Sequence, residues 1–173
     1  MSQRQLLFDW GGTLMRTDPL QDGPMCTWPR VEALPGALAL LRELAGAGVL
    51  CHLATGAADS NAAQIRRALA RVGLDSYLGR IFCVGTVGCG KESEGFYRRC
   101  AAMLGRPPEA LLMIGDSLAG DVLAARAAGL QAIWLHPAPP QSAVGNDAIG
   151  QLADLRQLEW VNRWLFGPGR RPW

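Results

Sequence analysis

Short apolar runs alternate along the chain with segments of helical periodicity. Five runs have the length of a buried strand: 6–8, 49–54, 81–84, 111–114 and 132–135. Apolar residues at the spacing of one helix face predict helices near 37–44, 62–72, 96–104, 118–125 and 148–165. Continuous apolar strands that alternate with helices are typical of a parallel sheet covered on both faces. We therefore predict an α/β fold with a doubly wound parallel sheet.

The composition narrows the class of protein. With 173 residues, of which 49% are apolar and 18% charged, the chain is expected to form a single domain over residues 1–173 and is not intrinsically disordered. Lys and Arg number 17 against 15 Asp and Glu, a formal net charge of +2. This balance is too even for a dedicated binder of nucleic acid or of an anionic membrane surface.

Charged residues interrupt each apolar stretch before the roughly 18 residues that a membrane span requires. Near the N-terminus, Asp9 limits the apolar run to a few residues, which argues against a signal peptide. We therefore expect a cytoplasmic protein. The five cysteines show no paired metal spacing and are interpreted as small core residues and loop thiols.

In a doubly wound sheet the ligand crevice lies at the carboxyl ends of the strands, so the residues that follow each run are candidates for chemistry. Asp9 precedes Gly11 and Gly12, whose backbone can approach a ligand closely, and its carboxylate can act as a nucleophile or a metal ligand. Thr55 and Gly56 follow the second run and offer a hydroxyl and an amide to phosphate oxygens.

Three further candidate residues follow the third and fourth runs. Lys91 is the only lysine in the chain and supplies a compact positive charge. Asp116 and Asp121 place two carboxylates at the start of a helix, in an oxygen-rich site of the kind that Mg²⁺ prefers. Taken alone, Asp121 is also a candidate helix cap.

Four segments resemble the four motifs of the haloacid dehalogenase-like (HAD) hydrolase superfamily. They are FDWGGTL at 8–14, LATG at 53–56, Lys91, and IGDSLAGD at 114–121. They occur in the same order as in that superfamily, and the resemblance spans essentially residues 5–135. It implies a HAD-like Rossmannoid fold and a Mg²⁺-dependent phosphohydrolase that acts on a phosphorylated small molecule through an aspartyl phosphate.

The same resemblance implies a role for each matching residue. Asp9 would be the nucleophile, and Thr55 and Lys91 would hold and neutralise the transferred group. Substrate contacts fall to Gly11, Gly12, Thr55, Gly56 and Lys91. The metal ligands would be Asp9, the backbone carbonyl of Gly11, and Asp116, with Asp121 orienting a metal-bound water or Lys91.

At Gly11 the first motif departs from the phosphatase pattern. Phosphatases of the superfamily usually read Asp-x-Asp, and the second Asp protonates the leaving group and later activates water. Such general acid–base catalysis is typically worth about 10²- to 10⁴-fold, so we expect weak activity or selectivity for good leaving groups. A HAD-fold binding or regulatory protein with little turnover is the alternative. Asp18 and Asp22, in the following loop, are candidates to replace the missing acid.

Two branches of the superfamily tolerate another residue at this position, and both fit poorly. Phosphonoacetaldehyde hydrolases read Asp-Trp-Ala-Gly-Thr, close to residues 9–13, but need a Schiff-base lysine in a cap domain, whereas Lys91 is assigned to the phosphate. Haloacid dehalogenases use a metal-free site, whereas Gly-Asp-Ser at 115–117 suits a metal enzyme.

The two segments that carry cap domains in the superfamily are short here. About twenty residues separate the first motif from Gly36, and about twenty-five separate Thr55 from the third run. We therefore expect an open site with no sizeable cap, lined at its mouth by Trp10, Met25 and Trp28. Such a site leaves the substrate undetermined among sugar phosphates, nucleotides, phosphoglycolate and phosphoproteins.

Other residues are given structural interpretations. His52 lies in an apolar run and is expected to be a core imidazole. Three arginines on one helix are expected to form a solvated face: Arg66, Arg67 and Arg71. Three tryptophans near the C-terminus suggest an interface, hence a homodimer: Trp160, Trp164 and Trp173.

Overall fold

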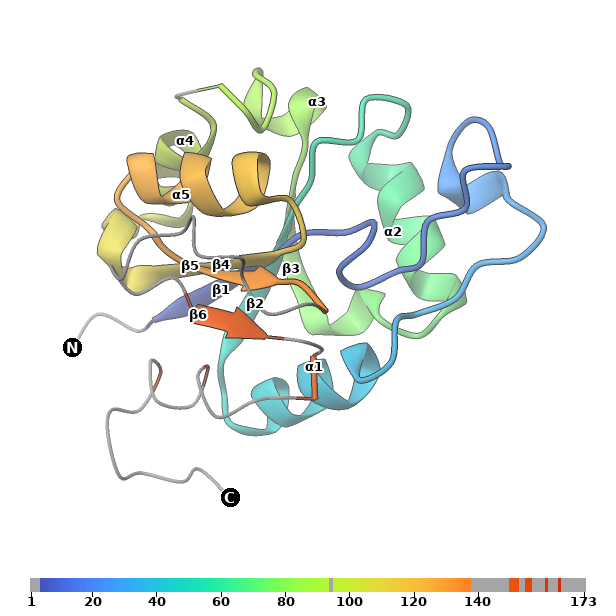
Figure 1. The fold of residues 1–173 in the computed structure, drawn as a ribbon, viewed down its shortest axis with the longest axis horizontal. Coiled ribbons are helices and arrows are strands. Elements are labelled where there is room, and N and C mark those ends of the chain that lie inside the picture. Colours follow the sequence, from blue (N-terminus) through green and yellow to red (C-terminus); the bar gives the residue numbers. More distant parts are fainter. Residues whose placement is uncertain are drawn as a thin grey trace.

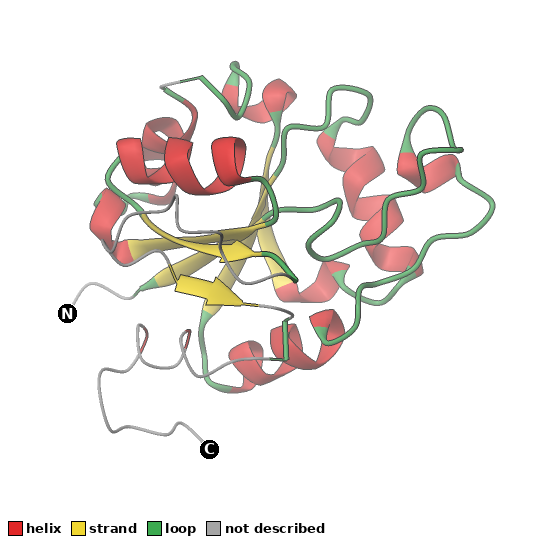
Figure 2. Ribbon diagram, viewed as in Figure 1, coloured by secondary structure: helices red, strands yellow, loops and turns green. Residues whose placement is uncertain are grey.

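A parallel sheet forms the centre of the molecule (Figures 1 and 2). The computed structural model describes residues 4–93, 95–137, 150–152, 155–156, 161 and 165. In this part of the chain the strands run in the order β3-β2-β1-β4-β5-β6, and every pairing is parallel. Their bounds are β1 Gln5–Phe8, β2 Leu50–Ala54, β3 Leu78–Phe82, β4 Leu111–Gly115, β5 Gln131–Leu135 and β6 Gly150–Leu152.

Helices cover both faces of the sheet, which confirms the doubly wound α/β prediction. Leu6 and Phe8 of β1 belong to one buried cluster with residues of α1 (Ala37–Gly46) and α2 (Ala62–Arg71). Leu7 belongs to the opposite cluster with residues of α4 (Phe96–Leu104) and α5 (Ala124–Ala127). Successive side chains of a strand point to opposite faces, so the uninterrupted apolar run of β1 serves both layers.

Shorter helical segments connect these elements. They are α3 (Val84–Val87), a π-helical turn that leads into α5 (Leu118–Leu123), and three 3-10 turns: Met25–Thr27, Asp75–Tyr77 and Pro108–Ala110. Neither 9–36 nor 55–77 holds a cap domain, because the first contains one 3-10 turn and the second contains α2 and another. The expectation of a chain without a sizeable cap is therefore confirmed. No described helix has the length and apolar character that crossing a membrane requires.

Two element predictions need correction. The third strand covers 78–82 and not 81–84, because the Thr86 hydroxyl accepts a hydrogen bond from the Cys83 amide at 2.9 Å and α3 begins at Val84. The last helix was expected from 148, but 150–152 form β6 beside β5. Val161 and Leu165 are helical as expected. Trp160, Trp164 and Trp173 lie outside the described residues, so the homodimer stays a prediction.

Arg67 and Arg71 are exposed, as the prediction of a solvated arginine face requires, and Arg66 is partly exposed. Arg66 and Arg71 nevertheless make contacts that the prediction did not include. Arg66 forms an ion pair with Asp75 at 2.7 Å between Nη1 and Oδ1. Arg71 donates hydrogen bonds at 3.2, 2.6 and 3.1 Å to three backbone carbonyls of a facing loop, those of Cys26, Trp28 and Pro29. Both side chains therefore link α2 to neighbouring segments, Arg66 through Asp75 and Arg71 through the facing loop.

The cysteines behave as predicted. All five are free thiols, and all but Cys89 are buried. Burial raises the pKa of Cys51 and of Cys100 to about 12, so neither is a reactive thiolate at neutral pH.

His52 is a buried imidazole with both ring nitrogens hydrogen bonded. Its Nδ1 accepts from the Arg80 amide at 3.0 Å, which leaves Nε2–H to donate to Gln5 Oε1 at 3.0 Å. Burial, and then the positive charge of Arg80, lower the pKa of His52 to about 4. A lowered histidine pKa stabilises the fold above the unfolded value of about 6.5, and that contribution is lost as the pH falls toward 4.

We therefore expect the free energy of unfolding to fall between pH 7.5 and 4.5 by on the order of 2 kcal/mol because of His52 alone. Urea unfolding of wild-type protein and of His52→Gln across this range measures the difference. Parallel pH curves for the two proteins would show that His52 contributes nothing to the pH dependence.

Candidate active site

The site begins where β1 ends. The Asp9 amide donates to the Ile114 carbonyl of β4 at 2.9 Å, which places Asp9 at the carboxyl edge of two neighbouring strands. The chain then turns through Gly12, whose φ of 81° lies in the left-handed region that favours glycine. This turn leaves the Asp9 side chain at the edge of the sheet, where it is 7% exposed.

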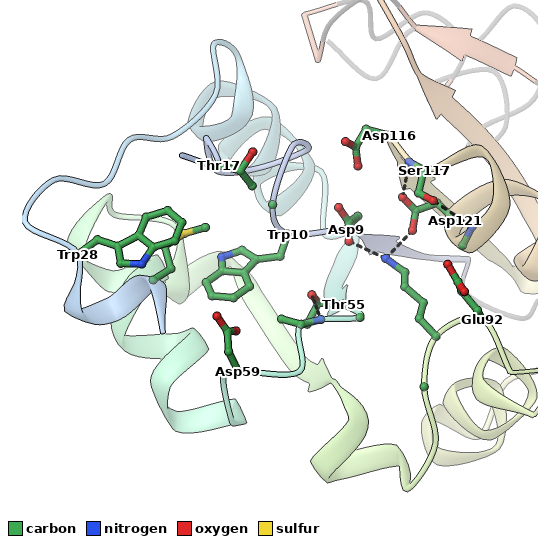
Figure 3. A pocket seen from close by; sticks show the side chains of 17 residues that line it. Asp9, Trp10, Thr17, Trp28, Thr55, Asp59, Glu92, Asp116, Ser117 and Asp121 are labelled. Carbon is green, nitrogen blue, oxygen red and sulfur yellow. Dashed lines mark hydrogen bonds and ion pairs between the residues drawn. The ribbon is translucent and has the colours of Figure 1, made fainter. Parts of the chain in front are cut away.

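Lys91 joins two carboxylates in the interior of the site (Figure 3). Its Nζ lies 2.5 Å from Asp9 Oδ1 and also forms an ion pair with Asp121 Oδ1. The other oxygen of Asp121 accepts from the Ser117 amide at 2.9 Å, and Asp121 is fully buried. Of the two partners expected for Asp121, a metal-bound water and Lys91, the contact with Lys91 is present, and the role of Asp121 stays a prediction.

The charged groups of this centre shift one another's pKa values. Burial alone would lower the pKa of Lys91, but the carboxylates of Asp9 and Asp121 raise it above its ordinary value, so Lys91 remains an ammonium. Burial, and then repulsion by Asp9, raise the pKa of Asp121 to about 6. The same two causes raise the pKa of Asp116. The centre thus contains three carboxylates and one lysine, and negative charge is in excess there.

The acidic cluster fits a divalent cation. Asp9, Asp116 and Asp121 each offer one oxygen, and these atoms lie within 4.8 Å of one another. The Thr13 hydroxyl lies 3.3 Å from Asp9 Oδ2 and 3.4 Å from Asp116 Oδ1, so it bridges two of the three. Hard oxygen donors with one exposed carboxylate, Asp116, are a donor set that Mg²⁺ accepts.

Two glycines leave room for these carboxylates. A Cβ at Gly12 would lie 2.2 Å from Asp116 Oδ2, and a Cβ at Gly115 would lie 2.1 Å from Asp121 Oδ2. Neither distance is compatible with a side chain unless the carboxylate moves. Gly12 therefore leaves room for the Asp116 carboxylate, and the substrate contact expected of it stays a prediction.

We expect Gly12→Ala to raise the Mg²⁺ concentration for half-maximal activity by about 10- to 100-fold, the usual cost of displacing a group that positions a metal ligand. Gly23→Ala is the matched control, since Gly23 also has a positive φ, 71°, but nothing lies within 4 Å of its added Cβ. Calorimetric titration with Mg²⁺ measures the change directly. Equal affinities in the two variants would contradict the assigned role of Gly12.

Thr55 ends β2 beside this centre. Its amide donates to the Phe82 carbonyl at 2.8 Å, and its hydroxyl oxygen accepts from the Ala57 amide at 3.1 Å. The hydroxyl therefore caps the turn after the strand and keeps its own proton available to a ligand. Gly56 lies against the stem of Lys91, because a Cβ there would be 3.6 Å from Lys91 Cβ.

An open cavity of about 550 Å³ unites these residues. Its lining includes seven of the predicted site residues, namely Asp9, Gly11, Thr55, Gly56, Lys91, Asp116 and Asp121. The predicted mouth residues Trp10, Met25 and Trp28 line it as well. Neither candidate for the missing acid, Asp18 or Asp22, is among the described residues that line it, and Asp18 Oδ1 instead accepts from the Leu20 amide at 2.9 Å.

Lining residues that were not foreseen from the sequence include Thr17, Asp59 and Glu92. Thr17 lies beside Gly11, since a Cβ on Gly11 would come within 2.8 Å of Thr17 Cγ2. No motif marks these three residues, because loop conformation alone brings them to the cavity. Thr13 was also unassigned, although its place directly after Gly11 and Gly12 was a usable signal.

The fold and the site together define an α/β protein with a carboxylate–lysine centre at the carboxyl edge of a parallel sheet. The family model of haloacid dehalogenase-like hydrolases matches residues 22–129, a stretch that contains Thr55, Lys91, Asp116 and Asp121. The chain belongs to this hydrolase family.

Curated relatives include two phosphatases. The chain is 30% identical to the phosphoserine phosphatase of Thermus thermophilus over 160 residues, which are 90% of this chain and 61% of the relative. It is 30% identical to a pyrimidine 5'-nucleotidase of Escherichia coli over 129 residues, 72% of this chain and 56% of the relative. The chain thus spans about three fifths of the length of these relatives.

A solved structure shares the architecture at nearly full length. An uncharacterized protein from Listeria monocytogenes serotype 4b superposes with a TM-score of 0.81 at 21% identity, covering 94% of this chain and 98% of that one. This similarity shows that the fold also occurs in another chain of nearly the same extent.

Proposed function

We propose that this protein is a Mg²⁺-dependent phosphohydrolase that acts on a phosphorylated small molecule through an aspartyl phosphate at Asp9. The observation that carries the proposal is the 2.5 Å contact between the buried Asp9 carboxylate and Lys91, with Thr55 and the acidic cluster around the same cavity. A nucleophilic carboxylate and a cation for the transferred group are what phosphoryl transfer requires.

Asp9 attacks phosphorus as the bond to the leaving oxygen breaks, and water then cleaves the aspartyl phosphate to release inorganic phosphate. Lys91 and Thr13, which each contact one Asp9 oxygen, fix the carboxylate for attack. Lys91 and the Thr55 hydroxyl neutralise the transferred group. Catalysis in this arrangement consists of positioning and charge stabilisation.

Asp9, Asp116 and the Gly11 carbonyl would hold Mg²⁺. When bound, Mg²⁺ supplies positive charge against the oxygens of the transferred phosphoryl group. Asp121 would serve the same site indirectly, because both of its oxygens are engaged by Lys91 and the Ser117 amide.

Gly11 favours the second candidate function, a HAD-fold binding or regulatory protein with little turnover. Gly11 provides no acid, and the adjacent space holds the methyl group of Thr17. A hydroxyl-bearing Thr17 is a weak acid, so it cannot replace a carboxylic acid at neutral pH. Turnover is therefore expected to depend on the leaving group.

We expect Gly11→Asp to raise turnover of alkyl phosphates by about 10²-fold while changing acyl phosphate turnover little, since only poor leaving groups need a general acid. The backbone permits the change: Gly11 is not among the glycines with positive φ, and only the exposed Thr17 side chain must move. Gly11→Asn is the matched control. A loss of both activities with Mg²⁺ binding intact would show that Gly11 is fitted to another chemistry.

The proposed function is tested by Mg²⁺-dependent phosphate release from a panel of acyl, aryl and alkyl phosphates, with Asp9→Asn as the blank. We expect release in the order acyl, aryl, alkyl. Folded protein that binds Mg²⁺ and releases no phosphate from any member would establish the binding or regulatory function instead.

A further inference from the structure

The cavity extends beyond the groups that hold the phosphoryl group. Trp10, Trp28 and Asp59 lie on one side of Asp9, whereas Lys91 and Glu92 lie on the other (Figure 3). Under the proposed function, the phosphoryl group would lie in the centre, beside Asp9 and Lys91. The leaving group of a substrate must therefore lie against one or both of these sides.

Hydrogen bonds hold the two tryptophans of the cavity lining, Trp10 and Trp28, in place. Arg71 of α2 donates at 2.6 Å to the Trp28 carbonyl, and the Trp28 indole N–H donates to the Gly23 carbonyl at 3.0 Å. The Trp10 indole N–H lies 3.1 Å from the Met15 sulfur. Trp10 is 3% exposed and packs in the core, whereas Trp28 is partly exposed. Because the indole N–H of Trp28 is already engaged, Trp28 offers a ligand only ring carbons and its π electrons.

Outside the reaction centre, the charged residues that line the cavity are negative. Among the described lining residues Lys91 is the sole cation, and it is paired with Asp9 and Asp121. Asp59 and Glu92 are exposed carboxylates, and neither forms an ion pair with another described residue. Asp59 is oriented by the Ser60 hydroxyl, which donates to its Oδ1 at 3.0 Å.

We propose that the substrate is the phosphate monoester of an alcohol that carries an ammonium group, bound by Trp28 and Asp59. This inference rests on the proposed function. The ring of Trp28 attracts a cation, and the Asp59 and Glu92 carboxylates favour a positive leaving group while repelling an anionic one such as that of phosphoglycolate. The nucleobase of a nucleotide would meet the Trp28 ring but brings no charge for Asp59.

The ammonium group also suits a site without an acid at position 11. A positive charge close to the leaving oxygen stabilises the negative charge that develops as the ester bond breaks. The overall reaction consumes one water and releases the ammonium alcohol and inorganic phosphate. The substrate thus supplies part of the stabilisation that Gly11 cannot.

Phosphocholine and 3,3-dimethylbutyl phosphate provide the test, because they share a shape and differ by one positive charge. We expect the Asp9→Asn protein with Mg²⁺ to bind phosphocholine about ten-fold more tightly by calorimetry, as a desolvated cation–π contact predicts. Adding Asp59→Asn or Trp28→Leu is expected to bring the ratio of the two affinities close to one. Asp22→Asn is the matched control, since Asp22 is exposed and does not line the cavity, and it should leave the ratio unchanged.

Equal affinities for the two esters overturn the inference, as does a preference that survives both Asp59→Asn and Trp28→Leu. The inference is also overturned if a nucleoside monophosphate binds more tightly than phosphocholine and this binding depends on Trp28 but not on Asp59. That result would favour ring stacking. Turnover of acetyl phosphate by the wild-type protein tests the proposed function separately. Release from acetyl phosphate together with equal affinities would therefore refute the inference and leave the phosphohydrolase intact.

Discussion

Asp9→Asn is expected to abolish phosphate release, lowering kcat for acetyl phosphate by at least about 10⁴-fold, in line with the loss of other catalytic nucleophiles. An amide has nearly the shape of the carboxylate but cannot attack phosphorus. Lys91 keeps its second partner, Asp121, so the interior of the site retains an ion pair and the protein should fold. Steady-state phosphate release measures the loss, and circular dichroism checks the fold.

The control for this prediction is Asp22→Asn, which makes the same chemical change on the loop that follows the first motif. It is expected to retain wild-type turnover, because Asp22 is exposed and does not line the cavity. If Asp9→Asn kept a tenth of wild-type turnover, a different group would have to carry the chemistry.

Lys91→Met is expected to reduce both activity and stability. Removing the ammonium leaves the buried carboxylates of Asp9 and Asp121 facing each other, and breaking a buried pair in this way typically costs about 3–5 kcal/mol. Activity should fall by at least about 10³-fold, since the transferred group loses its cation. Urea unfolding and phosphate release measure the two effects, and Lys91→Arg, which keeps the charge, is the control.

The loss of stability in Lys91→Met should depend on pH. Burial raises the pKa of Asp121 to about 6, and Lys91 is the main group that lowers it, so its removal raises this pKa further. The unpaired carboxylate destabilises the fold above that pKa and ceases to do so once protonated. The difference in unfolding free energy between wild type and variant is therefore largest near pH 7.5 and smaller at pH 5. A constant difference over this range would contradict the pairing.

The sequence predicted the sheet and the reaction centre because both follow from strand order. Uninterrupted apolar runs identify buried parallel strands, and the residues that end such strands gather at one edge. Asp9 and Lys91, 82 positions apart, were therefore expected in one site and lie in contact.

Features that depend on tertiary context escaped the sequence. The segment 150–152 has no alternating pattern and becomes a strand only because β5 offers it a free edge. Arg71 is exposed, as expected, but its hydrogen bonds were not predicted, because the backbone carbonyls that it binds leave no trace in the residue pattern. Asp59 and Thr17 reach the cavity through loop conformations that periodicity does not encode.

The most direct test of the central claim is mass spectrometry of protein quenched in acid during turnover of acetyl phosphate with Mg²⁺. We expect one phosphoryl group on the peptide that contains Asp9, absent from the Asp9→Asn protein. Phosphate release without any such adduct, or with the adduct on another residue, would contradict an aspartyl phosphate at Asp9.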